Sequence, residues 1–257
     1  MRQTFIAMGI CCAIGISTLA CQDKSKDYTD PTLPVSERVS SLMSQMTLEE
    51  KVAQMCQYVG LEHMKKAEKD MSAEDLKHSH SQGFYPNLHS SDVEEMTKKG
   101  LISSFLHVVK AEEANYLQSL AQQSRLKIPL LIGIDAIHGN GLYRGSTIYP
   151  TPIGQAATFD PALVERMSRE TAIEMRASGM HWTFTPNVEV ARDARWGRVG
   201  ETFGEDPYLV GQMGAATVRG FQTKDFTGND KVIACAKHLV GGSQPANGIN
   251  GAPAELS

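Results

Sequence analysis

The spacing of apolar residues along this chain alternates between two patterns. Apolar positions three or four residues apart, the spacing of a helix, occur in residues 38–46, 111–125, 161–178 and 207–221. Strand candidates occur in residues 101–109, 128–134, 182–186 and 232–240. The run at 128–134 is almost purely apolar, which is typical of a strand buried on both faces of a sheet, and 232–240 is predicted to be another buried strand. Because strands and helices alternate, the pattern predicts an α/β fold with a parallel sheet.

Local signals indicate where two helices begin. Thr47 is followed three residues later by Glu50, the pattern of a capping box, which predicts a further helix from residue 48. Asp160 and Pro161 are favoured at the cap and the first position of a helix, and Gly179 is favoured just after its end. These signals predict a helix over residues 161–178.

Residues 62–99 interrupt the alternation, because they are charged, rich in histidine and only weakly periodic. We expect an inserted helical or loop excursion here. Five histidines lie between His63 and His107, but their spacing matches no standard set of metal ligands. We therefore expect these histidines on the solvated surface, and we expect neither a metal ion nor a cofactor.

The start of the chain has the composition of an export signal. Arg2 is its only charged residue, and residues 4–20 are apolar or small. This stretch is short for a membrane-spanning helix, which needs about 20 apolar residues. We therefore predict a cleaved signal peptide over residues 1–20.

Cys21 follows the signal directly and opens a polar stretch that ends at residue 34. The arrangement resembles a bacterial lipoprotein signal, which implies that Cys21 becomes the lipidated first residue and residues 21–34 a tether. Thr18, where such signals usually carry leucine, leaves an ordinary cleaved signal as the alternative. The predicted location is the periplasm or the outer membrane of a Gram-negative bacterium, with membrane contact only through the lipid. Cys235 lies in an apolar run and is predicted to be a small core residue.

Composition narrows the class of partner. The 257 residues are 41% hydrophobic and 21% charged, as in ordinary globular domains. The formal net charge is −4 and there is no dense run of lysine and arginine, which argues against nucleic acid as the main partner. A neutral ligand such as a sugar remains compatible with this composition.

Polar groups follow the predicted strands at their carboxyl ends. Asp135 follows residues 128–134, residues 187–193 follow another run, and Lys237 and His238 lie late in the run at 232–240. The carboxyl ends of parallel strands meet at one edge of the sheet, where ligands bind. Ligand hydroxyls or internal salt bridges could compensate the desolvation of these groups. Three strand ends of similar polarity favour a shared site.

Four segments carry a family resemblance, namely residues 38–55, 133–139, 191–207 and 237–238. In this order and spacing they resemble the N-terminal domain of glycoside hydrolase family 3. The resemblance covers nearly all of the chain after the signal and is weakest over residues 62–99. It implies a (β/α)8 TIM-type barrel over residues 35–257, incomplete at its C-terminal end, as the first domain of a two-domain hydrolase.

The resemblance also implies retaining hydrolysis of β-linked sugars from the non-reducing end. Asp135 matches the carboxylate that binds sugar hydroxyls, and Arg198, Lys237 and His238 match the other hydroxyl-binding residues. A salt bridge from Arg198 to Glu201 or Glu205 is compatible with that role. Trp196 could serve as a platform for a sugar ring or as a buried packing residue, and we expect packing. We expect loop-fixing and helix-capping roles for three nearby acids, Glu201, Glu205 and Asp206.

The same resemblance implies that the nucleophile, an Asp, and the acid/base, a Glu, lie beyond Ser257. The segment after His238 lacks the sequence of the hexosaminidase branch, which favours β-glucosidase chemistry. We therefore interpret the chain as part of a β-glucosidase that is inactive alone. The alternatives are a β-xylosidase of the same family and a non-catalytic surface lipoprotein that binds sugar.

Overall fold

The computed structural model describes residues 27–72, 74, 85 and 87–254, so the predicted signal peptide and Cys21 lie outside the described residues. The chain divides into two compact units, Met1–Met46 and Thr47–Ser257. In the first unit, helix α1 (Val35–Gln45) confirms the helix predicted over residues 38–46.

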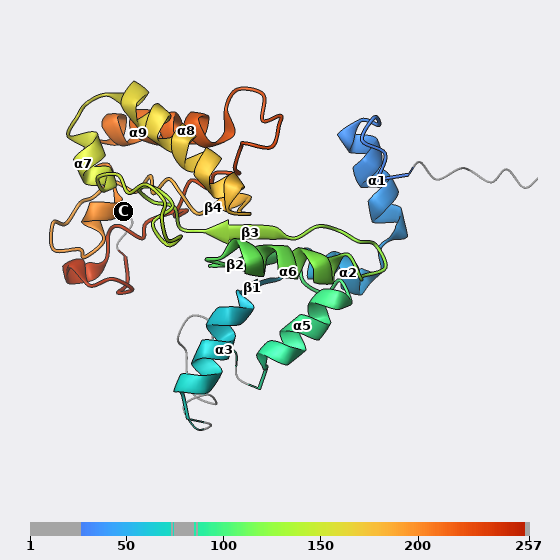
Figure 1. Ribbon diagram of the computed structural model, residues 1–257. Helices are drawn as coiled ribbons and strands as arrows, with labels where there is room; N and C mark the ends of the chain where they lie inside the picture. Colours follow the sequence, from blue (N-terminus) through green and yellow to red (C-terminus); the bar gives the residue numbers. More distant parts are fainter. Residues whose placement is uncertain (1–26, 73, 75–84, 86, 255–257) are drawn as a thin grey trace, which may run out of the picture. The chain divides into compact units, whose positions relative to one another are not determined.

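Four parallel strands form the sheet of the second unit (Figure 1). They are β1 (Gln57–Val59), β2 (Ser104–Leu106), β3 (Leu131–Ile134) and β4 (Trp182–Thr183). Their order in the sheet is their order in the chain, and each neighbouring pair is parallel. The predicted α/β fold is therefore confirmed, and β1 is a strand that the apolar pattern did not indicate.

The apolar run at residues 232–240 is not the continuous buried strand that the sequence predicts. Parallel bridges join Ile233 to Trp182 and Lys237 to Asn187, so the segment runs beside β4 and its continuation. The pairing is irregular because the Cys235 N–H donates to the Thr185 carbonyl while the Lys237 N–H donates to the Pro186 carbonyl, so two residues of this segment advance against one residue of its neighbour. At the end of the run, Leu239 and Val240 are 100% and 77% exposed.

Helices connect the strands, as the alternating pattern predicts. They are α2 (Leu48–Ala53), α3 (Leu61–Asp70), α5 (Ser90–Lys98), α6 (Ala111–Ala121), α7 (Pro152–Ala156), α8 (Pro161–Ala177) and α9 (Pro207–Gln222), with short 3-10 turns η1 (Val199–Glu201) and η2 (Ala246–Gly248). The described part of the excursion at residues 62–99 is mostly helical. Thr47 and Glu50 form the predicted capping box, with each side chain accepting from the other's backbone N–H.

Helices α8 and α9 pack closely against each other (Figure 1). Asp160 caps α8 by accepting a hydrogen bond from the Leu163 N–H at 3.0 Å, as the sequence predicts. In α9, a Cβ atom at Gly220 would lie 2.4 Å from the Glu165 carbonyl oxygen of α8. The missing side chain at Gly220 therefore sets how near the two helices can come.

The core of the second unit forms around β2 and β3. Phe105, Ile132 and Ile134 are fully buried, together with Leu117 of α6 and Met175 of α8. Full burial of such a side chain stabilises the fold by about 1.5–3 kcal/mol relative to exposure. The sheet is thus held between helices, and its polar strand ends have a rigid support.

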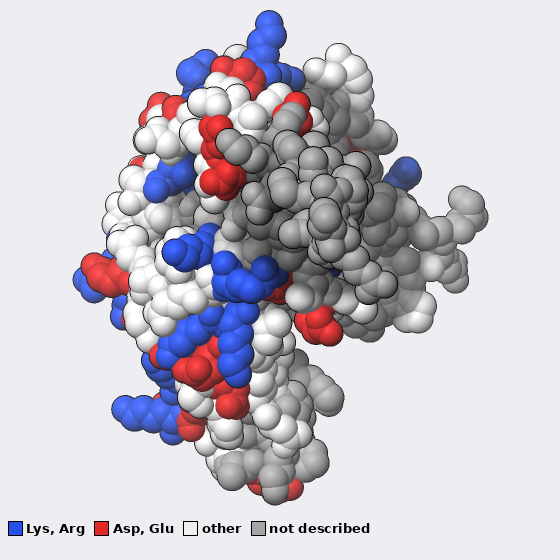
Figure 2. All heavy atoms as spheres, turned by 90° about the vertical axis from the view of Figure 1, so that its right-hand side faces the viewer, with Lys and Arg blue, Asp and Glu red and all other residues white. Residues whose placement is uncertain are grey.

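The charged surface is mixed in sign. Figure 2 shows basic and acidic side chains lying next to one another on the face drawn, in keeping with the net charge of −4. In the part of the chain that the structure describes, no helix is both long and apolar enough to cross a membrane. Among the same residues, no three His, Cys, Asp or Glu side chains are grouped so that they could hold a metal ion.

Candidate functional site

Polar side chains from successive strand ends meet at one edge of the sheet. His107 follows β2 directly and Asp135 follows β3 directly. Glu189 lies on the continuation of β4, and Lys237 and His238 lie on the segment that runs beside it. Because all these segments run in the same direction, their carboxyl ends bring together residues that are far apart in the sequence.

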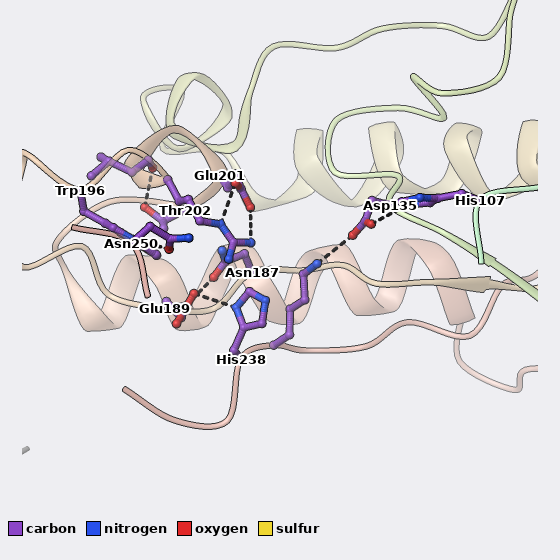
Figure 3. A network of polar contacts seen from close by, with 12 residues as sticks. His107, Asp135, Asn187, Glu189, Trp196, Glu201, Thr202, His238 and Asn250 are labelled. Atoms are coloured by element: carbon purple, nitrogen blue, oxygen red, sulfur yellow. Dashed lines mark hydrogen bonds and ion pairs between the residues drawn. The ribbon is translucent and has the colours of Figure 1, made fainter. Parts of the chain in front are cut away.

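Asp135 is held by two donors, one on each carboxylate oxygen. Lys237 Nζ lies 2.8 Å from Oδ1, and His107 Nε2 lies 2.9 Å from Oδ2. The side chains of Asp135, Lys237 and His107 are 27%, 17% and 24% exposed, so the cluster is sheltered but open to a ligand. Burial by itself would raise the pKa of Asp135, but the bonds to His107 and Lys237 outweigh it and hold that pKa below its usual range. Figure 3 shows Asp135 and His107 pointing toward one another.

Glu189 and His238 form a second hydrogen-bonded pair. His238 Nδ1 lies 2.9 Å from Glu189 Oε2. The Glu189 carboxylate is only 4% exposed, whereas the His238 ring is 39% exposed. The Glu189 N–H donates to Asn187 Oδ1 at 3.1 Å, which fixes the backbone that carries this carboxylate. The pair therefore has a buried acidic end and an accessible imidazole end.

Arg198 is bound in bidentate fashion to Glu201. Its Nε and one terminal nitrogen lie 2.9 and 2.8 Å from the two carboxylate oxygens. Of the two partners that the sequence suggested, Glu201 makes this bond, and Asp206 caps α9, as predicted. The hydrogen bond to Arg198 lowers the pKa of Glu201 despite its partial burial. Arg198 still has donors left for a ligand, because a guanidinium group carries five N–H bonds.

Trp196 and the Asp193–Arg195 pair complete the loop around Arg198. The indole ring is buried, as predicted, and its N–H donates to Asn250 Oδ1 at 3.0 Å. Hydrogen bonds from Arg195 hold the pKa of Asp193 at about 2. At that value Asp193 is a carboxylate at any ordinary pH and cannot donate a proton.

One cavity of ≈ 660 Å³ brings the four predicted binding residues together. Asp135, Arg198, Lys237 and His238 all line it. Its other polar lining residues are His107, His138, Glu201 and Asn250. Small-molecule sites typically have volumes of about 300–1,000 Å³ and a few convergent polar groups. The cavity has room for a sugar ring and many groups that can bind hydroxyls.

His107 corrects one sequence-based expectation. It was expected on the solvated surface with the other histidines, but it is partly buried and bonded to Asp135. The signal was present in the sequence, because His107 interrupts the apolar run at residues 101–109 as Asp135 ends the run at 128–134. Grouping the residue with the histidines of the excursion concealed its place at a strand end.

Several known proteins are similar to this chain. A β-xylosidase from Formosa agariphila is 39% identical over 178 residues, which cover 65% of this chain and 24% of that protein. A periplasmic β-glucosidase from Salmonella typhimurium is 29% identical over 237 residues, 89% of this chain and 27% of that protein. The chain thus spans about a quarter of the length of these relatives.

Solved structures of β-glucosidases are also similar to this chain. A mutant β-glucosidase from Listeria innocua in complex with laminaribiose is 31% identical with a TM-score of 0.67, and the match covers 86% of this chain and 29% of that one. The β-glucosidase of the same organism in complex with isofagomine is 32% identical with a TM-score of 0.63, over 82% of this chain and 27% of that one. The profile of the glycosyl hydrolase family 3 N-terminal domain matches residues 47–255. With this match over most of its length and the parallel α/β architecture described above, the chain belongs to glycosyl hydrolase family 3.

Proposed function

We propose that this chain is the sugar-binding part of a retaining exo-glycosidase that releases terminal β-D-glucosyl residues from the non-reducing ends of oligosaccharides or glucans. The observation that carries the proposal is the convergence of Asp135, Arg198, Lys237 and His238 on one cavity. The relatives named above, which are β-glucosidases and a β-xylosidase, support the same class of reaction.

The chemistry of the cavity suits a polyhydroxylated ligand. A carboxylate such as Asp135 accepts hydrogen bonds from two neighbouring hydroxyls, while Lys237 and Arg198 donate to hydroxyl oxygens. Each of these charged groups already has an internal partner, so the site remains compensated before a sugar binds. A sugar then adds hydrogen bonds to the remaining lone pairs and protons, and such bonds strengthen as the ring approaches the transition state.

The hydrolysis itself needs two further carboxyl groups. Retaining glycosidases use a nucleophile and an acid/base about 5–5.5 Å apart. The two acids that line the cavity, Asp135 and Glu201, are bound to cations and have lowered pKa values, so neither suits proton donation. In this proposal the nucleophile Asp and the acid/base Glu come from outside the described residues, beyond Ser257 as the resemblance implies.

A β-xylosidase is the second candidate. The relative from Formosa agariphila, at 39% identity, is a β-xylosidase. Glucose differs from xylose only in its hydroxymethyl group, and a difference of that size in a pocket changes specificity by about 10–200-fold. Relative rates on the two sugars therefore distinguish the candidates.

We also propose that the protein is exported and anchored through Cys21. The apolar start of the chain, the cysteine and the polar residues that follow support this location. The Salmonella typhimurium relative is a periplasmic enzyme, which agrees with export to that compartment.

The test uses the protein expressed over its entire reading frame without the signal peptide. Steady-state rates are measured on aryl β-glucoside and aryl β-xyloside, and binding of isofagomine is measured by calorimetry. We expect turnover of both substrates with the β-glucoside preferred by at least tenfold. A preference for the xyloside would replace the first candidate by the second. Binding without turnover would support a sugar-binding lipoprotein, and neither binding nor turnover would overturn the proposal.

A further inference from the structure

We propose that Glu189 is a positioning residue that holds the His238 imidazole in one orientation and one tautomer at the sugar-binding cavity. This inference rests on the proposed function for the identity of the ligand. The geometry of the pair by itself supports the structural role, because the Nδ1 to Oε2 distance is 2.9 Å. Glu189 is thus a carboxylate that acts on the site through the His238 ring, in addition to Asp135 and Glu201, which line the cavity.

Burial separates the roles of the two side chains. His238 lines the cavity and is 39% exposed, whereas Glu189 is 4% exposed and does not belong to the cavity lining. A buried carboxylate that does not line the cavity makes no direct contact with a ligand bound there. Its contact with a ligand is therefore indirect, through the imidazole.

The carboxylate depends on His238 because it has few other partners. Glu189 Oε1 is buried and, among the described residues, has no hydrogen-bond partner. Leaving a carboxylate buried with one bond is costly unless a cation or a strong donor compensates it. The His238 Nδ1–H supplies that bond, and the nearby Arg198 guanidinium supplies favourable charge. Glu201 and Lys237, one of each sign, are further charged groups near the ring, and Asp135 lines the same cavity.

The pair determines which ring nitrogen meets the ligand. An ionised carboxylate only accepts hydrogen bonds, so Nδ1 carries the proton that is donated to Glu189. Nε2 is then the nitrogen left for the cavity, as an acceptor when the ring is neutral and as a donor when it is charged. In either state Nε2 can bind a sugar hydroxyl, and the fixed ring loses little entropy on binding.

The close approach of Gly242 is an independent indication that the fold accommodates the Glu189 carboxylate in this position. A Cβ atom at position 242 would lie 2.5 Å from Glu189 Oε1, so a larger residue there would push the carboxylate away from the ring. The loop after His238 thus passes close over Glu189 and leaves room for the carboxylate only because position 242 lacks a side chain. Figure 3 shows His238 pointing toward Glu189 in this arrangement.

Two measurements on the full-length protein test the inference. The first needs no sugar: selectively 15N-histidine-labelled wild type and Glu189→Gln are compared by NMR, with His238→Asn to assign the signal. We expect the Nδ1–H form of His238 in the wild type. A mixture of tautomers is expected in Glu189→Gln, because an amide can either donate or accept. A wild-type ring in the Nε2–H form, or an unchanged tautomer in the variant, would overturn the inference.

The second measurement uses isofagomine binding and turnover of an aryl β-glucoside. Losing the orienting charged bond should weaken binding and raise KM about tenfold in Glu189→Gln, with kcat less affected. Glu189→Asp should recover part of the loss, and Gly242→Ala should reproduce it by a separate route. Glu205→Gln, which neutralises an exposed acid of the neighbouring loop, is the matched control and should behave as wild type.

The outcomes separate this inference from the function on which it rests. A folded Glu189→Gln protein with wild-type KM and isofagomine affinity would refute the positioning role while leaving the glycosidase proposal intact. A wild type that neither binds nor hydrolyses sugar would end the functional proposal. In that case the tautomer of His238 still decides whether Glu189 orients the ring.

Discussion

Replacing Asp135 by asparagine tests the centre of the site with little change in volume. The variant removes the negative charge between Lys237 Nζ at 2.8 Å and His107 Nε2 at 2.9 Å. It also removes one acceptor, because the amide nitrogen of asparagine can only donate. The ammonium group of Lys237, which is 17% exposed, then lacks its anionic partner.

The expected loss of activity in Asp135→Asn follows from the number of charged hydrogen bonds that the variant loses. A hydrogen bond to a charged group typically contributes about 1.5–3 kcal/mol, which corresponds to about one to two decades in rate. If Asp135 binds one or two sugar hydroxyls in the transition state, Asp135→Asn should lower kcat/KM by about 10–100-fold. Lys237→Met should cost less, about tenfold, because His107 still holds the carboxylate in place.

The assay is kcat/KM for an aryl β-glucoside with the full-length protein, with the double variant completing a cycle. Asp225→Asn serves as the control, because this acid lies in an exposed loop and does not line the cavity. We expect the two single effects to be non-additive, since the residues are in direct contact. An Asp135→Asn enzyme with kcat/KM within twofold of wild type would remove Asp135 from the site and with it the assignment of Lys237.

Three further predictions address helix packing, acid stability and anchoring. Gly220→Ala should lower the free energy of unfolding by about 1–3 kcal/mol through overpacking against α8, whereas Gly211→Ala, in the same helix with no neighbour within 4 Å, should raise it by up to about 1 kcal/mol in denaturant titrations. Burial, and then the charge of Arg176, lowers the pKa of His181 from 6.5 to about 4. The unfolded chain takes up this proton first, so stability is fully present above pH 6.5 and falls as the pH drops toward 4. His181→Asn, whose amide oxygen can replace Nδ1 as acceptor for the Ile132 N–H, should flatten the fall in melting temperature over that range, and an unchanged slope would contradict the assignment. Labelling cells with a fatty-acid probe should tag the wild type but not Cys21→Ala, and an untagged wild type would refute the anchor and leave export untouched.

Much of the local structure was predictable because its causes are local. The capping box at Thr47, the Asp160 cap of α8 and the apolar run that becomes β3 each depend on residues a few positions apart. The place of Asp135 was predictable for the same reason, since a carboxylate that directly follows a buried strand lies at the carboxyl end of the sheet. Thr47 and Asp135 also lie in two of the segments that carry the family resemblance.

The partners of the charged groups were decided by the tertiary structure. Asp135 and Lys237 are 102 residues apart in the chain, and only the parallel alignment of strand ends brings them to 2.8 Å. The same alignment gives His107 a role in the site that its histidine-rich sequence context concealed. It also gives Glu189 a buried place behind His238, which no spacing along the chain indicates.

The run at residues 232–240 shows both what the sequence indicates and what only the tertiary structure decides. Its composition is that of a buried strand, and its first part does lie beside β4. The run does not continue as a regular ladder, because the register shifts by one residue between Cys235 and Lys237, and Leu239 and Val240 at its end are exposed. Sequence alone determines which residues favour a strand or a cap, since those preferences depend on neighbours along the chain. Whether a strand continues, and which charge meets which, depends on hydrogen-bond partners that only the folded chain brings together.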